Sequence, residues 1–381
     1  MTIKKQNIST DYWFKIVCQL LERANIKING NQPYDIQVKN NNFFKRILQQ
    51  GSIGLGESYM DVWWECERLD IFFYRLLRAR LDQKIPAKFT DIIRIMAAKL
   101  YNLQSKKRAY IVGKEHYDLG NDLFTNILDP NMQYSCGYWK DANTLNQAQQ
   151  KKLELICEKL QLKPGMRLLD IGCGWGGLAN FASKNYNVSV TGITISREQQ
   201  RFFQEHNKGL DVKILLEDYR NLYNNQFDRI VSVGMFEHVG AKNYSTYFDV
   251  IKRNLKQEGL FLLHTIGSNS HGFNVDPWMD KYIFPNGSLP SMIDIGKSSK
   301  DKFILEDWHN FGADYDKTLM AWYRNFLTTW PKLKTNYSPR FKRMFSYYLN
   351  SCAGAFRARR IQLWQVLWSH EGIEGGLNVP R

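Results

Sequence analysis

The alternation of strand and helix patterns beyond residue 148 constrains the fold of this chain more than any other feature. Apolar runs typical of buried strands lie at 166–172, 187–194, 212–218, 227–238 and 259–267. Helical patterns lie at 147–162, 176–186 and 196–208. Strands that alternate with helices in this way predict an α/β fold with a doubly wound, mostly parallel sheet. Ligands bind such sheets at the carboxyl ends of the strands.

A glycine loop follows the first of these strands, in the segment LLDIGCGWGG at 168–177. Gly172, Gly174 and Gly176 allow a tight turn and a close approach by a nucleotide ligand. The spacing is GxGxG, whereas dinucleotide-binding folds use GxGxxG. The loop therefore indicates a nucleotide site of another class.

The polar residues around the loop indicate which class. A dinucleotide fold places an acid about 20 residues after the glycines, where it binds a ribose. Here the second strand ends without Asp or Glu, and its polar residues are Thr194, Ser196 and Gln199. Instead, Asp170 precedes the glycines and Asp218 follows the third strand. This layout is typical of methyltransferases that bind S-adenosyl-L-methionine, and a glycine turn without a ligand is the alternative.

Two titratable residues are predicted at the ends of later strands. Glu237 and His238 follow the apolar run VSVGMF, and His264 lies near the end of the fifth strand. A buried carboxylate is costly unless a partner satisfies it, so we expect Glu237 to hold something. Two simpler interpretations are that Glu237 is an ordinary substrate ligand and that His264 is a satisfied core histidine.

Residues 1–83 are predicted to form a small N-terminal domain. It contains a helix at 11–26, a strand at 35–40, and a glycine loop followed by an aromatic-rich helix within 51–65. Residues 84–116 are predicted to form a basic amphipathic helix and linker. Such a helix suits a membrane interface, but it equally suits packing against neighbouring helices.

The charge distribution bears on possible partners. The net charge is +15, and residues 1–116 hold 20 Lys and Arg against 11 Asp and Glu. This excess favours a nucleic acid or an anionic membrane surface, although ordinary solubility charge is the alternative. The six cysteines are scattered without a CxxC pair, so we expect no disulfide framework, no metal site and a reducing cytoplasm. Neither a signal peptide nor a run of about 20 apolar residues is apparent.

Seven segments taken in order resemble the family of cyclopropane-fatty-acid-phospholipid synthases. They are MQYSCGYW, LLDIGCGWGG, GITIS, SVGMFEHVG, LHTIG, EDWHNFGADYDKTLMAWYRNF and YYLNSCAGAFRARRIQLWQVLWS. The resemblance extends from about residue 85 to 375, and the N-terminal region resembles that of the full-length bacterial enzymes. The related mycolic-acid cyclopropane synthases lack this N-terminal extension.

The resemblance implies a class I, Rossmann-like methyltransferase domain at 117–381 with a lid insertion at about 268–331. It implies transfer of a methylene group from S-adenosyl-L-methionine to a cis double bond of an unsaturated phospholipid, with bound bicarbonate as the base. The implied bicarbonate ligands are Cys136, Glu237, His264, Ile266 and Tyr315. Cys352 is implied to line the same site, although Cys136 and Cys352 each also suit a small buried apolar position.

The motifs also imply a set of cofactor-binding residues: Tyr134, Ser135, Asp170, Gly172, Cys173, Gly174, Trp175, Gly176, Thr194, Ile195, Ser196, Gln199, Asp218 and Tyr219. The same resemblance implies a homodimer, peripheral on the inner face of the cell membrane. The aromatic residues of 268–331 suit the wall of an acyl-chain site.

Three other functions are compatible with parts of the sequence. A nucleic-acid methyltransferase commonly has an Asn/Asp-Pro-Pro-aromatic motif after the fourth strand, but here that position reads GMFEHVG. A methyltransferase of a small molecule or another lipid shares all the cofactor residues. A non-enzymatic membrane protein with a vestigial nucleotide fold is disfavoured by the intact loop, Asp218 and Glu237.

Overall fold

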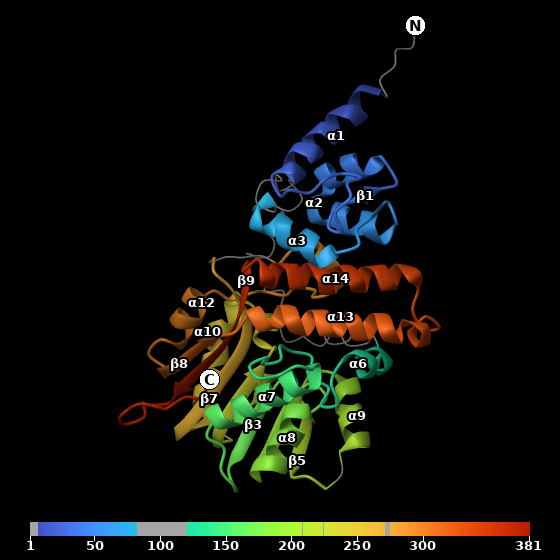
Figure 1. The fold of residues 1–381 in the computed structure, drawn as a ribbon. Helices are drawn as coiled ribbons and strands as arrows, with labels where there is room; N and C mark the ends of the chain where they lie inside the picture. The colour runs from blue at the N-terminus through green and yellow to red at the C-terminus, as the bar shows by residue number, and fades with distance from the viewer. Residues whose placement is uncertain (1–6, 82–119, 208, 224, 271–274) are drawn as a thin grey trace. The chain divides into compact units, whose positions relative to one another are not determined.

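The computed structural model describes residues 7–81, 120–207, 209–223, 225–270 and 275–381, with backbone alone for 7–11. The chain divides into two compact units (Figure 1). Unit 1 comprises the described residues of 1–102, 276–285 and 327–360. Unit 2 comprises those of 103–275, 286–326 and 361–381.

Unit 2 is built on a seven-stranded sheet with the strand order β5-β4-β3-β6-β7-β9-β8. The strands are β3 (Arg167–Ile171), β4 (Ser189–Thr194), β5 (Val212–Leu216), β6 (Phe227–Val233), β7 (Leu255–Ser268), β8 (Ile304–Asn310) and β9 (Ile361–Ser369). Strands β3 to β7 pair in parallel, whereas β9 is antiparallel to both β7 and β8. The predicted doubly wound, mostly parallel sheet is therefore confirmed. Its order reverses between β3 and β6, which is where such sheets bind ligands.

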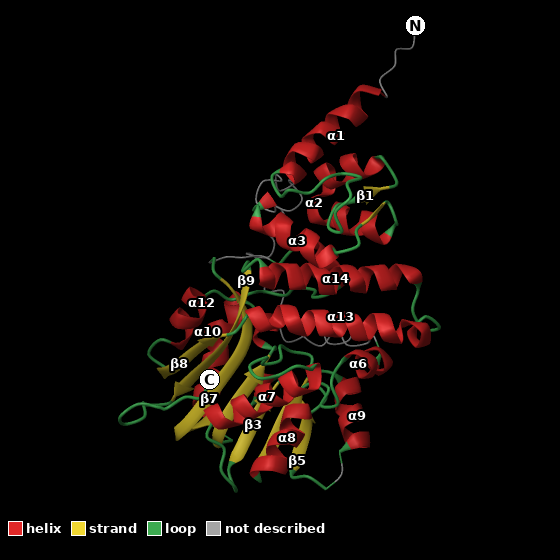
Figure 2. Cartoon of the chain, in the orientation of Figure 1, coloured by secondary structure: helices red, strands yellow, loops and turns green. Residues whose placement is uncertain are grey.

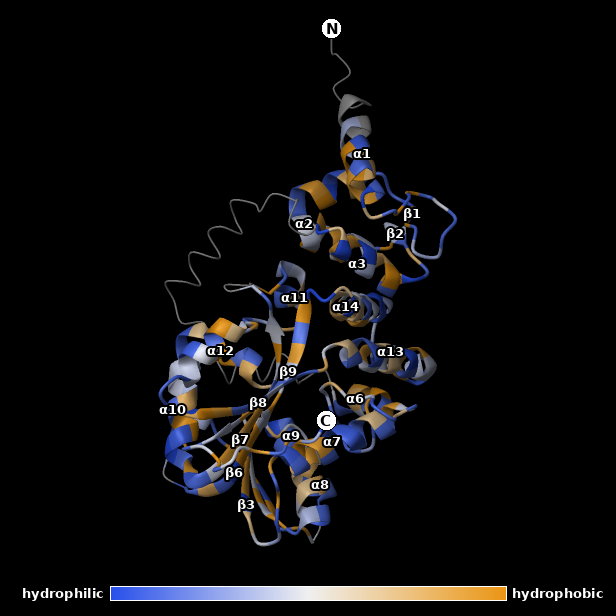
Figure 3. Cartoon of the chain, turned by 60° about the vertical axis from the view of Figure 1, so that its left-hand side comes forward, coloured by the Kyte–Doolittle hydropathy of each residue, from blue (hydrophilic) through white to orange (hydrophobic). Residues whose placement is uncertain are grey.

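Helices cover both faces of this sheet because successive side chains of each strand point to opposite faces. Leu168, Val231 and Leu262 pack with helices α7 and α8 on one face. Their neighbours Leu169 and Ile230 pack with α10 on the other. The central strands are accordingly mostly hydrophobic in Figure 3. The helices with a described side-chain environment in this unit are α6 (Asn121–Ile127), α7 (Leu145–Lys159), α8 (Gly177–Tyr186), α9 (Arg197–His206), α10 (Tyr244–Asn254) and α12 (Met292–Ser299).

Unit 1 is mostly helical in its described part (Figure 2). Its elements are α1 (Asn7–Glu22), β1 (Gln37–Val38), α2 (Asn42–Met60), β2 (Trp64–Glu65), α3 (Leu69–Arg78), α11 (Pro277–Tyr282) and α14 (Pro339–Arg357). Helix α13 (Ala313–Leu333) begins in unit 2 and ends in unit 1. Gly354 brings α14 close to α3, because a Cβ atom there would lie 2.6 Å from Phe73 Cβ. The buried carboxylate of Asp70 accepts from both Arg68 and Arg357, which ties the two helices together.

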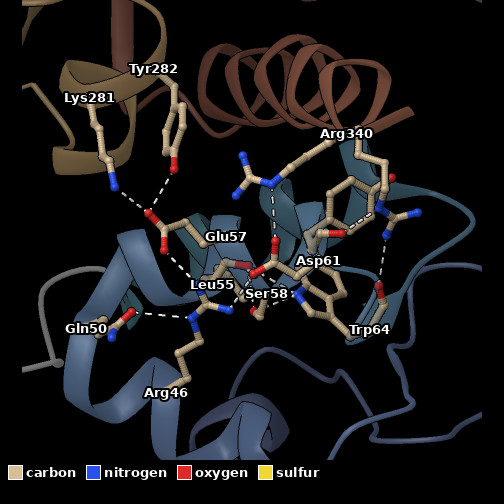
Figure 4. Close-up of polar contacts among 12 residues, drawn as sticks. Arg46, Gln50, Leu55, Glu57, Ser58, Asp61, Trp64, Lys281, Tyr282 and Arg340 are labelled. Carbon is tan, nitrogen blue, oxygen red and sulfur yellow. Dashed lines mark hydrogen bonds and ion pairs between the residues drawn. The ribbon is translucent and has the colours of Figure 1, made fainter. Parts of the chain in front are cut away.

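Glu57 links α2 to α11 within unit 1 (Figure 4). Its Oε1 atom accepts from Lys281 Nζ at 2.6 Å and from the Tyr282 hydroxyl at 2.8 Å, and its Oε2 atom accepts from Arg46 at 2.6 Å. Burial raises the pKa of Glu57, but these hydrogen bonds outweigh it and lower the pKa to about 2. Asp61 extends the network to Arg340 on α14.

One local prediction for the N-terminal region is wrong. Instead of a glycine loop followed by an aromatic-rich helix, residues 42–60 form α2, which consists of two helical stretches joined by a kink at Gly51, and Trp64 lies in strand β2. The helix is interrupted only at Gly51, whose φ of 56° lies in the left-handed region that glycine adopts readily. Gly56 is required by packing, because a Cβ atom there would lie 2.4 Å from the Trp278 ring. Tertiary contact therefore overrides the low helix propensity of glycine.

The compact units differ from the predicted domains. Residues 276–285 and 327–360 were predicted within the catalytic domain, but they pack with the N-terminal residues in unit 1. The predicted lid at 268–331 is likewise not one body, because it includes α11 of unit 1 and the sheet strand β8 of unit 2. Side-chain packing by α14 and α11 explains the difference. The predicted basic helix and linker at 84–116 lies outside the described residues.

Within the described part of the chain, none of the helices has both the length and the apolar character needed to span a bilayer.

Candidate active site

The glycine loop joins β3 to α8 at the carboxyl edge of the sheet. Gly174 has a φ of 56°, and a Cβ atom built on it would meet nothing within 4 Å. By contrast, a Cβ atom on Gly176 would lie 2.3 Å from the Phe203 ring. Gly174 therefore leaves space beside the loop, whereas Gly176 is needed for internal packing. An open backbone cradle of this kind suits a nucleotide ligand.

The three polar residues at the end of β4 bond to one another. The Thr194 hydroxyl donates to Gln199 Oε1 at 2.7 Å, and Ser196 Oγ accepts from the Gln199 backbone N–H at 3.3 Å. Ser196 is the N-cap of α9, which explains why this polar cluster follows the strand. Ile195 lies between them, half-buried. The cluster thus shapes the loop beside the glycines, and all three polar side chains are buried.

The two predicted acids have different surroundings. Both oxygens of Asp218 accept from the Arg220 guanidinium, at 2.8 and 2.6 Å. An adenine amino group bound there would therefore share Asp218 with Arg220. Asp170 is buried in β3, and burial raises its pKa to about 7 although the charge of Lys152 opposes the shift. Tyr219, which follows Asp218, packs edge-on against Tyr247, and its buried hydroxyl has no partner among the described residues.

The loop that carries the predicted residues Tyr134, Ser135 and Cys136 is hydrogen-bonded to α7. Gln149 donates to the Ser135 carbonyl at 2.8 Å, and Lys152 Nζ donates to Ser135 Oγ at 3.1 Å and to the Gln133 side chain. Gln149 and Lys152 are fully buried, and burial lowers the pKa of Lys152 to about 8. Two polar side chains of α7 therefore hold Gln133 and Ser135, the residues on either side of Tyr134.

Aromatic rings pack beside this loop. Tyr134 lies 5.0 Å from Phe124 and 5.1 Å from Trp322, measured between ring centroids. Trp175 of the glycine loop lies 4.9 Å from Phe124, and its indole N–H donates to Asn121. Rings from α6, the glycine loop and α13 thus form one cluster. Cys173, also in the glycine loop, is buried within the apolar core.

Glu237 is held by the backbone of the neighbouring strand. It lies in a short 3-10 helix, Phe236–His238, directly after β6, and its Oε1 atom accepts from the Ile266 N–H at 2.6 Å. Its Oε2 atom is buried without a partner among the described residues. Burial raises the pKa of Glu237 to about 7, although the Ile266 N–H and the Thr265 side chain both oppose the shift. The Ile266 N–H is therefore used by Glu237, and one carboxylate oxygen remains to be satisfied.

His264 lies on β7 opposite Val233, where β6 ends. The ring is buried, and its Nε2 atom has no partner among the described residues. Burial, together with the nearby charges of Lys152 and Lys159, holds the pKa of His264 well below its ordinary value. The imidazole is consequently neutral at pH 7. His264 and Glu237 thus each present one unsatisfied polar atom at the carboxyl ends of adjacent strands.

Cys136 lies against α13, the helix that also carries Tyr315. Thr318 Oγ1 lies 4.0 Å from Cys136 Sγ and accepts from the Gly137 N–H at 3.1 Å. Tyr315 lies one turn earlier on α13, and its ring is buried against Trp322. Burial raises the pKa of the Cys136 thiol well above its ordinary value, so it remains protonated. Cys352 belongs to α14 in unit 1, and its predicted place in the site stays a prediction.

Four buried polar residues near these groups were not predicted: Gln149, Lys152, Thr318 and Gln365. The sequence held a signal for two of them. Residues 149, 152, 153 and 156 share the buried face of α7, and a glutamine and a lysine interrupt an otherwise apolar stripe there. Thr318 and Gln365 carried no such signal, because their partners lie on elements distant in sequence.

Comparison with known proteins identifies the family. Residues 104–366 match the family model described as mycolic acid cyclopropane synthetase, which is more than half of the chain. The chain belongs to this family. Its members are S-adenosylmethionine-dependent methyltransferases, and the chain is such an enzyme. The resemblance noted in the sequence is thereby confirmed.

Individual proteins similar to this chain extend the comparison. The cyclopropane-fatty-acyl-phospholipid synthase of Escherichia coli strain K12 is 67% identical over 379 residues, covering 100% of this chain and 99% of that protein. A probable fatty acid methyltransferase of Pseudomonas putida is 37% identical and covers 70% of each chain.

Solved structures confirm the fold. The cyclopropane synthase MmaA2 from Mycobacterium tuberculosis superposes with a TM-score of 0.64 at 32% identity, covering 68% of this chain and 97% of that chain. Mycolic acid cyclopropane synthase CmaA1, crystallised with SAH and CTAB, has the same TM-score, identity and coverage. The class I, Rossmann-like methyltransferase fold expected from the sequence is therefore confirmed.

Proposed function

We propose that the chain is a cyclopropane-fatty-acyl-phospholipid synthase, which transfers a methylene group from S-adenosylmethionine across a cis double bond of an unsaturated phospholipid acyl chain. The observation that carries the proposal is the 67% identity with the Escherichia coli enzyme of that name. This identity extends over the whole chain, whereas the methyltransferase fold alone does not specify a substrate, because enzymes of many substrates share it.

S-Adenosylmethionine supplies an activated methyl group when bound. In the proposal, the cofactor lies beside the open side of Gly174, with Gly172 and Gly176 shaping the turn. In this arrangement Asp218 would accept a hydrogen bond from the adenine amino group in addition to the one that Arg220 already donates to it. In the proposal, the other cofactor residues are those near the ends of β3, β4 and β5 and those of the loop that is hydrogen-bonded to α7.

An alkene is a weak nucleophile, so the chain must hold the double bond against the methyl group and exclude water. The aromatic cluster of Tyr134, Phe124, Trp175 and Trp322 supports this role. Its apolar rings suit an acyl chain. Their faces are also able to stabilise the positive charge that passes onto the substrate carbon.

Bound bicarbonate supplies the base that removes a proton from the transferred methyl group. Two unpartnered atoms support this proposal: Glu237 Oε2 would accept from the OH of the ion, and His264 Nε2 would donate to one of its oxygens. Tyr315 contributes its hydroxyl and Cys136 its backbone. Ile266 acts through Glu237, because its N–H already orients that carboxylate.

The reaction is tested by incubating the protein with S-adenosylmethionine and vesicles of unsaturated phospholipid. Each modified acyl chain is expected to gain one CH₂ group and lose one double bond, which mass spectrometry and proton NMR detect together. A product that keeps every double bond would indicate a methyltransferase of another lipid or small molecule.

The base is tested by removing dissolved carbon dioxide and bicarbonate. Turnover is expected to fall on depletion and to recover when bicarbonate is restored, with unchanged affinity for S-adenosylmethionine. Equal rates in verified bicarbonate-free and bicarbonate-replete buffer would instead make a protein side chain the base, with Glu237 the first to examine.

The proposal extends to the membrane. The excess of nine positive charges in residues 1–116 supports peripheral binding to an anionic bilayer, which holds the substrate. The resemblance to the bacterial enzymes is the basis for proposing a homodimer on the cytoplasmic face of the cell membrane.

A further inference from the structure

Two buried polar side chains face each other on adjacent strands of unit 2. His264 on β7 and Gln365 on β9 are directly opposite in the antiparallel register. Gln365 Nε2 lies 3.4 Å from His264 Nδ1. The two residues are 1% and 0% exposed, so solvent does not compete for this contact. Directly opposite residues of paired strands point to the same face of a sheet, which is why residues 101 positions apart meet here.

Each member of the pair has one further polar atom without a partner among the described residues. These atoms are His264 Nε2 and Gln365 Oε1. A neutral imidazole carries one hydrogen, and the hydrogen bond at one ring nitrogen determines which nitrogen bears it. Because His264 is neutral in this buried position, its contact with Gln365 decides whether Nε2 is a donor or an acceptor.

We infer that Gln365 is a positioning residue whose side-chain NH₂ donates to His264 Nδ1 and so keeps the hydrogen of His264 on Nε2. In this tautomer the unpartnered Nε2 atom is a donor. This inference rests on the proposed function, in which Nε2 donates to an oxygen of bicarbonate. The opposite tautomer would present a lone pair to an anion and repel it.

A second histidine lies on the other side of Gln365. His309 on β8 is its cross-strand partner there, so one row across three strands reads His264, Gln365, His309. Lys159 Nζ lies 3.1 Å from His309 Nδ1. An ammonium group only donates, so His309 Nδ1 accepts and the hydrogen of its neutral ring lies on Nε2.

The row is anchored by a buried ion pair. Lys159 also donates to Asp307 Oδ2 at 3.1 Å, and Arg381 binds the same carboxylate. The positive charge of Lys159 contributes to the lowered pKa of His264 and thereby disfavours an imidazolium there. Gln365 therefore lies between two histidines. Lys159 determines which nitrogen of His309 carries the hydrogen, and Gln365 determines this for His264.

The test uses the full chain labelled with nitrogen-15 at histidine. The side-chain nitrogen spectrum of the wild type, assigned with a His264→Gln variant, is expected to show His264 protonated at Nε2 and unprotonated at Nδ1. Gln365→Leu removes the donor and is expected to give a mixture of tautomers. Gln365→Glu replaces it with an acceptor and is expected to move the hydrogen to Nδ1.

Kinetics supply the second measurement. The bicarbonate concentration for half-maximal rate is expected to rise about ten- to hundredfold in both Gln365 variants, as for other residues that orient a liganding histidine. The affinity for S-adenosylmethionine is expected to stay constant. The matched control is Gln362→Leu, because Gln362 is also buried in β9 but accepts from Asn310 instead. This control is expected to keep the wild-type spectrum and bicarbonate dependence.

A wild-type His264 protonated at Nδ1 would overturn the inference, and this result does not depend on whether the Gln365 variants fold. Unchanged His264 signals in a folded Gln365→Glu protein would also overturn it. The spectra could agree with these expectations while the wild-type rate is independent of bicarbonate. That result would support the role of Gln365 toward His264 and would refute bicarbonate as the base.

Discussion

At the scale of single residues, Glu237 explains how a buried carboxylate is tolerated at the end of a strand. The Ile266 N–H satisfies Oε1, but Oε2 is left without a partner among the described residues. An unsatisfied buried acceptor costs about 1–3 kcal/mol, more when it is charged. The side chain therefore favours the protonated form until a ligand donor reaches Oε2.

The stability of the ligand-free protein is expected to show this cost. The folded-state pKa of Glu237 is raised to about 7 from its ordinary 4.5. Its contribution to stability is thus fully present below pH 4.5 and is lost as the pH rises through about 7. Glu237→Gln removes this titration. The free energy of unfolding of the variant, relative to that of the wild type, should therefore increase between pH 4.5 and 8. The gain is on the order of 3 kcal/mol, at about 1.4 kcal/mol per tenfold change in proton affinity.

Urea unfolding at pH 5 and pH 8 measures the difference between the two proteins. The same variant is expected to lose about 10²–10⁴-fold in turnover while it retains cofactor affinity, because its NH₂ group is a donor where an acceptor is needed. A stability difference that is independent of pH would contradict the assigned cost of the buried charge.

At the scale of elements, two short segments carry the cofactor edge of the sheet. The glycine loop supplies open backbone, and α7 supplies the polar groups that hold residues 133–136. These roles make different demands on the sequence. The loop needs the absence of a side chain, whereas α7 needs two polar side chains on a buried helix face.

Gly174→Val is expected to abolish binding of S-adenosylmethionine while the protein still folds. The new side chain would project into the open space beside the loop, and its left-handed backbone costs only about 1–2 kcal/mol. Isothermal titration calorimetry measures the affinity and circular dichroism the fold. Gly176→Val is the contrasting variant, because it would clash with Phe203 and destabilise the fold itself. Unchanged cofactor affinity in Gly174→Val would refute this placement.

Lys152→Met is expected to weaken cofactor binding about tenfold or more. The change removes the donor to Ser135 and Gln133, and it removes the charge that lowers the pKa of Asp170. The matched control is Lys151→Met on the same helix, because the Lys151 side chain is 49% exposed and pairs only with nearby Glu154 among the described residues. Calorimetric titration of both variants decides. Equal affinities would show that α7 does not support the cofactor site.

At the scale of the whole molecule, the order of the chain differs from the order of packing. Two segments of the catalytic region, residues 276–285 and 327–360, pack with the N-terminal residues in unit 1. Glu57 secures the first of these segments through Lys281 and Tyr282. Unit 1 is therefore completed by sequence that lies within the catalytic region.

Glu57→Gln is expected to destabilise unit 1 by on the order of 2 kcal/mol at pH 7, because it weakens charged hydrogen bonds to three partners. Its pKa is lowered to about 2, so the stabilisation is present above pH 4.5 and is lost as the pH falls through about 2. The thermal unfolding temperatures of the wild type and Glu57→Gln should become more similar as the pH falls from 5 to 2. Glu67→Gln, a change at an exposed acid of the same unit, should match the wild type throughout.

Binding to lipid vesicles is the expected consequence of the net charge of +15. Sedimentation with vesicles should show stronger binding to anionic phosphatidylglycerol than to zwitterionic phosphatidylcholine. Each Lys or Arg near the surface contributes about 1 kcal/mol, and salt screens the attraction. If binding depends on neither the lipid charge nor the ionic strength, the positive charge would contribute to solubility and not to membrane binding.

The strands and the glycine loop of unit 2 were predictable from sequence because their signals are local. An apolar run such as 227–233 is typical of a buried strand wherever it lies, and Gly174 marks a turn without reference to distant residues. The helical conformation at Gly54 and Gly56 was not predictable, because the Trp278 ring that requires a glycine at position 56 lies 222 positions away in the chain.

The class of the sheet, the edge where a nucleotide is expected and the residue types at that edge follow from local patterns in the chain. The hydrogen bond from Ile266 to Glu237, the contact of Gln365 with His264 and the packing of α14 in unit 1 became apparent in the folded protein. The physical reason is that strand register and helix packing depend on contacts between residues far apart in the chain. Hydrophobic periodicity specifies which face of an element is buried, but not which distant side chain meets it there.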